Sequence, residues 1–364
     1  MKKLLIPFFV FSTLLADAQS LNVDSVIAPK IKKVKSGPLF KSDDTLNFTL
    51  FADLKPLLRD RGDNPKNHWG MVKYLNHNNK LVEIPIKVCV RGNFRRMTQN
   101  CTFPPLLLDF DKKKKGNSIF NHQNKLKLVT HCLKKDYIME EYLVYKIFNI
   151  ITDYSFKARI ANVTYEDSLG KQASQTRLAF LLEDDEDLAK RIHSKYLKDI
   201  KLRQNQVDTL KMATVSVFEY LIGNTDWSVP FQHNIKIYFK KGEKAIPIPY
   251  DFDHSGIVNA IYAKPAEQLI EISSVRERLY RGFAYSPLVF QIVFDKFKAV
   301  KPEIYSLYVG NTELEPNYIK STLKYLDEFY EIIDNKKLVK REFIDQGLKN
   351  MGPGSVQIQG LNSN

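Results

Sequence analysis

Two short segments on either side of a predicted β-hairpin constrain this chain more than any other feature. The first runs from Gly223-Asn224-Thr225-Asp226 to His233-Asn234, and the second is Ile248-Pro249-Tyr250-Asp251-Phe252-Asp253. Together they place an acid after a predicted helix, an amide side chain a few positions on, and a second acid after a predicted strand. Any fold of this chain has to accommodate these polar side chains at the ends of apolar elements.

The elements around the two segments follow from the spacing of apolar residues. Residues 207–222 show the apolar periodicity of a buried helix, and Gly223 is a typical stop signal directly after it. Residues 235–239 and 245–248 are short β-like runs separated by a turn-prone stretch at 240–243. The sequence therefore predicts a helix, a loop and a hairpin, with the acids flanking the hairpin.

These polar residues have the composition of a site for a divalent metal ion. A carboxylate at Asp226 lies on a loop that a rigid helix positions, and Asn234 and Asp251 are expected to face one ion. Asp253 is placed to share it, because alternate residues of an extended backbone point to one side. Oxygen ligands of this kind suit Mg²⁺ or Mn²⁺. Taken singly, each residue is more typical of a cap, a loop hydrogen bond or a hairpin closure, but their order favours a metal site.

At this point a family resemblance can be stated. Four segments resemble motifs of the spore-coat kinase CotH family and its atypical-kinase relatives: Arg91-Gly92-Asn93, Asn224-Thr225-Asp226, His233-Asn234 and Ile248-Pro249-Tyr250-Asp251-Phe252-Asp253. They span residues 82–256, about half of the chain. The resemblance implies a two-lobed protein-kinase-like α+β fold, with ATP and Mg²⁺ or Mn²⁺ as cofactors. It also implies that Asp226 is the catalytic acid and that Asp251 binds metal.

The chain departs from the usual kinase pattern in its phosphate-binding elements. It has no Gly-x-Gly-x-x-Gly loop, and seven residues separate Asp226 from Asn234, more than in typical kinase catalytic loops. A basic turn is the candidate replacement, since glycine permits close backbone approach and arginine offers bidentate contacts to phosphate. Its residues are Arg91, Gly92, Asn93, Arg95 and Arg96. The competing interpretation is an ordinary surface hairpin tip.

A cation near the phosphates is expected to be held by a helix glutamate. We predict Lys127, on a strand just before a helix at 136–152, paired with Glu141 on that helix. Lys125 and Glu140 are near-equal alternatives, and solvated lysines are the plain structural interpretation. Glu183, at the end of an apolar strand, lies where the resemblance places adenine.

The first residues and the cysteines point to export. Residues 1–18 have a basic head, a short apolar run and a small-x-small cleavage site, as in a signal peptide, and residues 19–36 read as an extended leader. A periplasmic or secreted location is oxidising, so the three cysteines predict one disulfide and one free thiol. We favour Cys101 with Cys132, because Cys89 lies in a strand pattern that suits a small buried side chain, although spacing leaves a bridge through Cys89 open.

The predicted organisation is a β-rich N-lobe with one major helix at residues 37–182, and a helical C-lobe with the hairpin at 183–351. Residues 352–364 form a tail. No apolar stretch approaches the length of a membrane span. The formal net charge of +14 favours anionic partners, whereas nucleic acid is disfavoured because its recognition motifs are missing.

The leading functional hypothesis is an exported atypical kinase that transfers phosphate from ATP to a hydroxyl group of an envelope or secreted protein. The expected partners are a nucleotide and an acidic or hydroxyl-bearing protein. A catalytically inactive binding or assembly module is the alternative, since the glycine loop is missing and ATP is scarce outside the cytoplasm. Transfer of AMP in place of phosphate is a third possibility.

Overall fold

Several strands in the first half of the chain bury every second side chain, as expected for a sheet with one covered face. The computed structural model describes residues 37–359 except 112 and 134–135, and all of these belong to the unit 34–364. The strands of this region are β1 (Leu46–Ala52), β2 (His68–Leu75), β3 (Leu81–Val90), β4 (Leu106–Phe110), β5 (Lys125–Thr130), β6 (Ala158–Asp167) and β7 (Gln175–Leu182).

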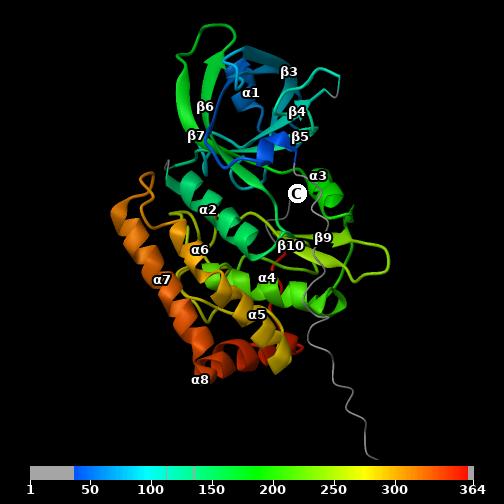
Figure 1. The fold of residues 1–364 in the computed structure, drawn as a ribbon, viewed down its shortest axis with the longest axis vertical. Helices are drawn as coiled ribbons and strands as arrows, with labels where there is room; N and C mark the ends of the chain where they lie inside the picture. Colours follow the sequence, from blue (N-terminus) through cyan, green and yellow to red (C-terminus); the bar gives the residue numbers. More distant parts are fainter. Residues whose placement is uncertain (1–36, 112, 134–135, 360–364) are drawn as a thin grey trace, which may run out of the picture. The chain divides into compact units, whose positions relative to one another are not determined.

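These seven strands close into a barrel within the described part of the chain, in the order β1-β2-β3-β4-β5-β7-β6. Neighbours pair antiparallel except β1 and β6, which run parallel with Leu46 opposite Ala161 and Ala52 opposite Asp167. The inward side chains form one apolar core. Figure 1 shows the barrel at one end of this unit, above helix α2 (Asp136–Ile151).

The expected two-lobed protein-kinase-like fold is wrong. The structure has a closed mixed barrel and a separate three-stranded sheet with helices, and not a clearly two-lobed kinase architecture. Apolar alternation identifies the individual strands, but closure depends on pairing between β1 and β6, more than a hundred residues apart. Local periodicity carries no information about such long-range pairing.

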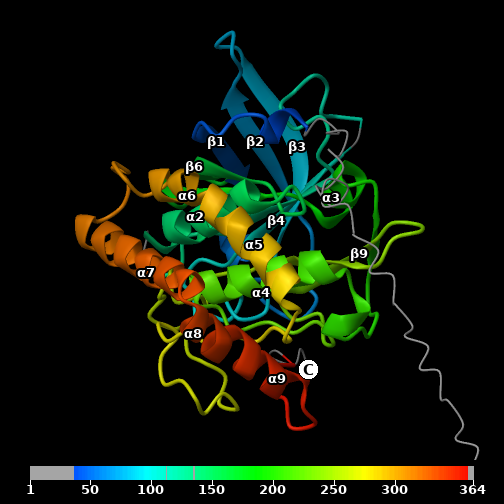
Figure 2. The same ribbon diagram turned by 60° about the horizontal axis from the view of Figure 1, so that its bottom comes forward.

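The second core forms around helix α4 (Thr209–Ile222), whose residues from Met212 to Ile222 are all buried. A helix that is apolar on all sides requires neighbours on all sides. These include the sheet β10-β9-β8, and Figures 1 and 2 show α4 crossed by α5 on the helical side. The remaining strands are β8 (Lys195–Leu197), β9 (Ile235–Phe239) and β10 (Ile246–Pro249).

The helices and turns that complete the structure confirm the predicted helical character of the later sequence. The short helix α1 follows β1 and the short helix α3 follows β7, whereas helices α5 to α9 come after the β9–β10 hairpin. Their bounds are α1 (Leu54–Arg59), α3 (Asp185–Arg191), α5 (Pro287–Ala299), α6 (Lys301–Ser306), α7 (Pro316–Asp334), α8 (Lys336–Val339) and α9 (Gln346–Met351), with 3₁₀ turns at Pro38–Phe40 and Gln204–Gln206 and a π-helical turn at Lys340–Asp345.

A disulfide joins Cys101 to Cys132, which confirms the favoured pairing, and Cys89 is a half-buried free thiol. The bridge links the loop after β3 to the segment between β5 and α2, and it fits an oxidising extracellular environment. The predicted signal peptide and leader lie outside the described residues. No helix in the described part is both long and apolar enough to cross a bilayer.

Removing the disulfide should lower the stability of the folded chain. The two cysteines are 31 residues apart, and closing a loop of this length stabilises a protein by about 3 to 4 kcal/mol on the chain-entropy model. We expect Cys101→Ser/Cys132→Ser to shift the urea unfolding midpoint downward, whereas Cys89→Ser leaves it nearly unchanged. Equal midpoints for both variants would show that the bridge adds nothing.

Candidate functional site

The β9–β10 hairpin brings Asn234 and Asp251 to the same end. Ile235 pairs with Pro249, and the Tyr250 N–H donates to the Asn234 carbonyl at 3.0 Å. Asn234 and Asp251 have left-handed backbone, with φ of 51° and 64°. Such a conformation costs energy for residues other than glycine, although Asn and Asp tolerate it best. The surrounding structure therefore holds both residues in place, and their strain is typical of functional positions.

Asp226 is held by the loop that follows α4. Gly223 ends the helix with φ of 67°, and a Cβ atom there would lie 2.0 Å from the Tyr325 hydroxyl, so no other residue fits. The Asn224 side-chain oxygen then accepts from the Asp226 N–H at 3.0 Å. The predicted helix stop is confirmed, and it fixes the backbone of the candidate catalytic acid.

The carboxylate of Asp226 lies against His233 and Asn234. His233 Nε2 is 2.8 Å from Asp226 Oδ1, and the Asn234 amide donates to Asp226 Oδ2 at 3.1 Å. A small bridge between Ser228 and His233 folds the intervening residues into a turn, which accommodates the long spacing seen in the sequence. Burial alone would raise the pKa of Asp226, but the hydrogen bond and charge of His233 hold that pKa below its usual value.

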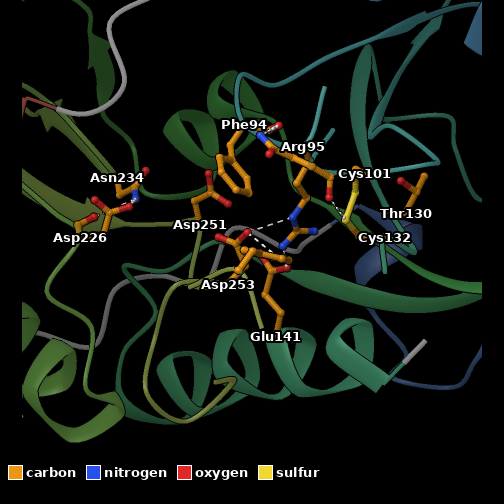
Figure 3. Close-up of polar contacts among 12 residues, drawn as sticks. Phe94, Arg95, Cys101, Thr130, Cys132, Glu141, Asp226, Asn234, Asp251 and Asp253 are labelled. Atoms are coloured by element: carbon orange, nitrogen blue, oxygen red, sulfur yellow. Dashed lines mark hydrogen bonds and ion pairs between the residues drawn. A yellow bond between two sulfur atoms is a disulfide. The ribbon is translucent and has the colours of Figure 1, made fainter. Parts of the chain in front are cut away.

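A buried arginine joins Asp253 to helix α2. The Arg95 guanidinium donates to Glu141 Oε2 at 2.5 Å and to Asp253 Oδ2 at 3.0 Å (Figure 3). The Tyr262 hydroxyl also donates to Asp253 Oδ2, at 3.0 Å. The predicted pairing of Glu141 with Lys127 is therefore wrong. The reason is that Arg95, from the loop after β3, reaches the helix glutamate first.

The two acids that contact Arg95 have pKa values shifted in opposite directions. Burial raises the pKa of Glu141 and outweighs the opposing charge of Arg95, and the negative charge of Asp253 raises that pKa further. For Asp253, the effect of burial is overcome by Arg95, and the pKa falls below its usual value. Asp253 is thus the ionised partner of Arg95, with its second oxygen unused by any described donor.

Asp251 is the exposed acid of the site. Its N–H donates to the Tyr145 hydroxyl of α2 at 2.9 Å, while no donor among the described residues contacts its carboxylate. In Figure 3 this carboxylate lies between the Asp226–Asn234 pair and the Arg95–Asp253 pair. The surrounding protein and then the negative charge of Asp253 raise the pKa of Asp251. A cation bound beside Asp251 would stabilise its ionised form.

Lys127 lies in the site but has a partner other than the predicted one. Its ammonium group is 3.0 Å from Asp185 Oδ1, and Lys236 reaches the other oxygen of Asp185 at 3.1 Å. Burial lowers the pKa of Lys127 to about 8. The negative charge of Asp185 raises this pKa, and the positive charge of Arg91 lowers it further. Lys125, the alternative, is exposed on the same strand.

Of the other sequence candidates, Arg91 and Asn93 have side chains without a described partner, whereas Glu183 is bound by an arginine. Arg91 is half-buried, its side chain has no described partner, and its positive charge acts on both Lys127 and Asp251. Asn93 is exposed in the neighbouring turn. Glu183 is buried and bound at 2.8 Å by both Arg191 Nε and Nη2, so its side chain has a structural role.

Several residues of the site were missed by the sequence analysis. His233 stands directly before Asn234, so the motif that found Asn234 also contained the signal for it. Asp185 and Lys236 come from α3 and β9, and Tyr145 and Tyr262 come from α2 and the segment after the hairpin. Only the tertiary structure brings these four residues to Lys127, Asp251 and Asp253.

The donor set fits a metal ion that is shared with a phosphate ligand. The described residues contain no group of three His, Cys, Asp or Glu side chains that could hold a metal ion. Mg²⁺ is commonly bound by one or two carboxylates together with substrate phosphates, and not by a complete protein cage. Asp251, the amide oxygen of Asn234 and the unused oxygen of Asp253 supply oxygen atoms of this kind.

A second buried acid lies beneath the Asp226 loop. Glu219 of α4 is 1% exposed, and neither carboxyl oxygen has a hydrogen-bond partner among the described residues. Burial raises the pKa of Glu219 well above its usual value, and the nearby charge of Asp226 raises it further, against the Asn224 amide. Burial therefore favours the protonated, neutral form of Glu219.

Comparison with known proteins matched no family model and no curated protein. The resemblance to the CotH family therefore stays a prediction from four short motifs. What the site can do has to be argued from its geometry and its charges.

Replacing Arg95 should be much more damaging than replacing its neighbour. Arg95→Met leaves Glu141 and Asp253 buried without a cation, which costs about 3 to 5 kcal/mol. Arg96→Met removes contacts to the Gly62 carbonyl and to Asp63, whose side chain is 73% exposed, so it leaves no buried charge unpaired and should cost less, about 1 to 2 kcal/mol. The loss in Arg95→Met should shrink at low pH, where Asp253 accepts a proton and its buried charge is removed. Similar urea midpoints for the two variants would contradict the assigned role of Arg95.

Glu219→Gln should change how stability depends on pH. The folded protein keeps a proton on Glu219 that the unfolded chain releases above about pH 4.5, so the free energy of unfolding falls by about 1.4 kcal/mol per pH unit from this group. The glutamine variant lacks this loss and should gain stability relative to wild type as the pH rises above the pKa of the unfolded glutamate. Urea titrations test this, with the exposed Glu331→Gln as control, and parallel pH profiles would refute it.

Proposed function

We propose that this protein is a phosphotransferase that uses ATP with Mg²⁺ or Mn²⁺ to phosphorylate a hydroxyl group of an extracytoplasmic protein. The observation that carries the proposal is the set formed by Asp226, Asn234 and Asp251. A low-pKa acid, an amide oxygen and an exposed acid meet at one end of the β9–β10 hairpin. Phosphoryl transfer needs few other protein groups, because positioning and charge neutralisation dominate its catalysis.

Asp226 is suited to orient the acceptor hydroxyl and take its proton. Its side chain is 29% exposed, so a substrate can reach it. His233 and Asn234 hold its two oxygens in a fixed direction, and the lowered pKa keeps it ionised at neutral pH. A base held in one orientation within hydrogen-bond reach of the proton is what general base catalysis requires.

The cations of the site are suited to the donor nucleotide. Arg91 has a guanidinium without a described partner, and Lys127 lies within its electrostatic influence. Arginine binds phosphate oxygens in pairs, and lysine does so as a point charge. The metal ion, held by Asn234, Asp251 and Asp253, would neutralise phosphate oxygens when it is bound.

The acceptor is inferred from charge and compartment. The chain carries a formal net charge of +14, which favours an acidic partner, and its disulfide fits an oxidising space. An acidic, hydroxyl-bearing protein of the envelope or the secreted fraction meets both conditions.

Nucleotide binding is tested first, by thermal melting with ATP and Mg²⁺ or Mn²⁺. A ligand that binds only the folded state raises its stability, so we expect the melting temperature to rise. Asp251→Asn should abolish the metal-dependent part of the rise. Glu243→Gln, in the exposed turn at the other end of the same hairpin, should preserve it.

Transfer is tested by mass spectrometry with dephosphorylated casein as an acidic, hydroxyl-rich probe. Asp226→Asn should bind ATP normally but lower the rate about 10² to 10⁴-fold, the usual contribution of a general base. The mass added also separates phosphate from AMP. An unchanged melting temperature of the wild-type protein with ATP and metal would contradict the proposal. Nucleotide binding without phosphate transfer to casein or to the protein itself would indicate a binding module.

A further inference from the structure

Two lysines of the site share one carboxylate. Lys127 of β5 and Lys236 of β9 contact opposite oxygens of Asp185, at 3.0 and 3.1 Å. The side chains of Lys127, Lys236 and Asp185 are only 10%, 13% and 19% exposed. Two ammonium groups are thus held close together in a largely buried position, with one negative charge between them.

This arrangement leaves positive charge without a described counterion. Like charges that are buried together are costly unless enough opposite charge accompanies them, and Asp185 neutralises only one lysine. Arg91 adds a third positive charge, which acts on both Lys127 and Asp251, and its side chain has no described hydrogen-bond partner. A purely structural ion pair needs one lysine, so the second lysine bound to Asp185 favours a further anion at this position.

The lysine pair is located beside the candidate metal ligands. Lys236 lies in β9, two residues after Asn234, which directly precedes that strand. The ring of Tyr250 lies 5.0 Å from the Lys236 ammonium and 5.8 Å from that of Lys127, and Tyr250 directly precedes Asp251. One tyrosine therefore separates the two lysines from the exposed acid of the site.

We propose that Lys236, with Lys127 and Arg91, forms a binding site for the polyphosphate chain of a nucleotide. The ligand class is a linear polyphosphate anion, whose oxygens would join Asp185 as partners of the two ammonium groups. The inference deepens the proposed function, because it names the residues that hold the phosphates of the donor. It adds Lys236, which belongs to none of the motifs found in the sequence.

The anion site can be tested without nucleotide or transfer. The probe is inorganic tripolyphosphate, titrated into the full protein by calorimetry at low salt, where electrostatic binding is weakly screened. We expect Lys236→Met to weaken its binding at least about tenfold, or 1.4 kcal/mol. Lys236→Arg should retain most of the affinity. Lys240→Met, at the exposed end of β9 where the lysine pairs with Glu243, should match wild type.

A second variant predicts a change of opposite sign. Asp185→Asn removes the bridging negative charge, so tripolyphosphate should bind more tightly than to wild type, and the melting temperature in its presence should rise further. This variant also decides the matter if Lys236→Met does not fold. Absence of tripolyphosphate binding in wild type, unchanged affinity in Lys236→Met, or weaker binding in Asp185→Asn would each overturn the inference.

The outcomes separate this inference from the proposed function. Lys236-dependent binding of tripolyphosphate without transfer to casein supports the anion site and counts against the phosphotransferase. Phosphate transfer to casein, together with an unchanged tripolyphosphate affinity in Lys236→Met, supports the phosphotransferase and counts against the anion site.

Discussion

The buried guanidinium of Arg95 is the contact on which the rest of the site depends. It joins a loop of the barrel to Glu141 on α2 and to Asp253 beyond the hairpin, three segments that are far apart in the chain. The ionised carboxylate of Asp253 would be costly to bury alone, and Arg95 supplies its counter-charge while it also donates a hydrogen bond to Glu141, whose pKa is raised by burial. The disulfide at Cys101 restrains the same loop a few residues later. The position of Asp253, and of Asp251 beside it, is therefore set by contacts from both cores of the protein.

The hairpin contributes a second constraint, which is local. Asn234 and Asp251 adopt left-handed backbone at adjacent strand ends, and the Tyr145 hydroxyl of α2 accepts from the Asp251 N–H. Strain of this kind persists where packing overrides it. Because the backbone is held, the amide of Asn234 can restrain Asp226 while its oxygen stays available. The proposed base and metal ligands thus lie on elements that these contacts join, which is the preorganisation that the proposed phosphoryl transfer would require.

Short-range features of the sequence were predicted well. The helix ending at Gly223, the hairpin with its turn at 240–243, and the Cys101–Cys132 bridge are all present, since each follows from residues close together or from a small set of cysteines. Closure of the barrel through β1 and β6 was missed because periodicity is silent on long-range pairing. The partner of Glu141 was missed for a related reason: a loop arginine and a strand lysine are equally basic in sequence, and only packing decides which reaches the helix.

The central claim is that Asn234 and Asp251 hold one divalent ion against the phosphates of a nucleotide. Crystals grown with Mn²⁺ and a non-hydrolysable ATP analogue test it most directly, through the anomalous scattering of manganese. The account predicts a manganese peak between the Asn234 amide oxygen and the Asp251 carboxylate, in contact with phosphate. A bound analogue with its manganese away from both side chains, or saturating manganese with no peak at this end of the hairpin, would contradict it.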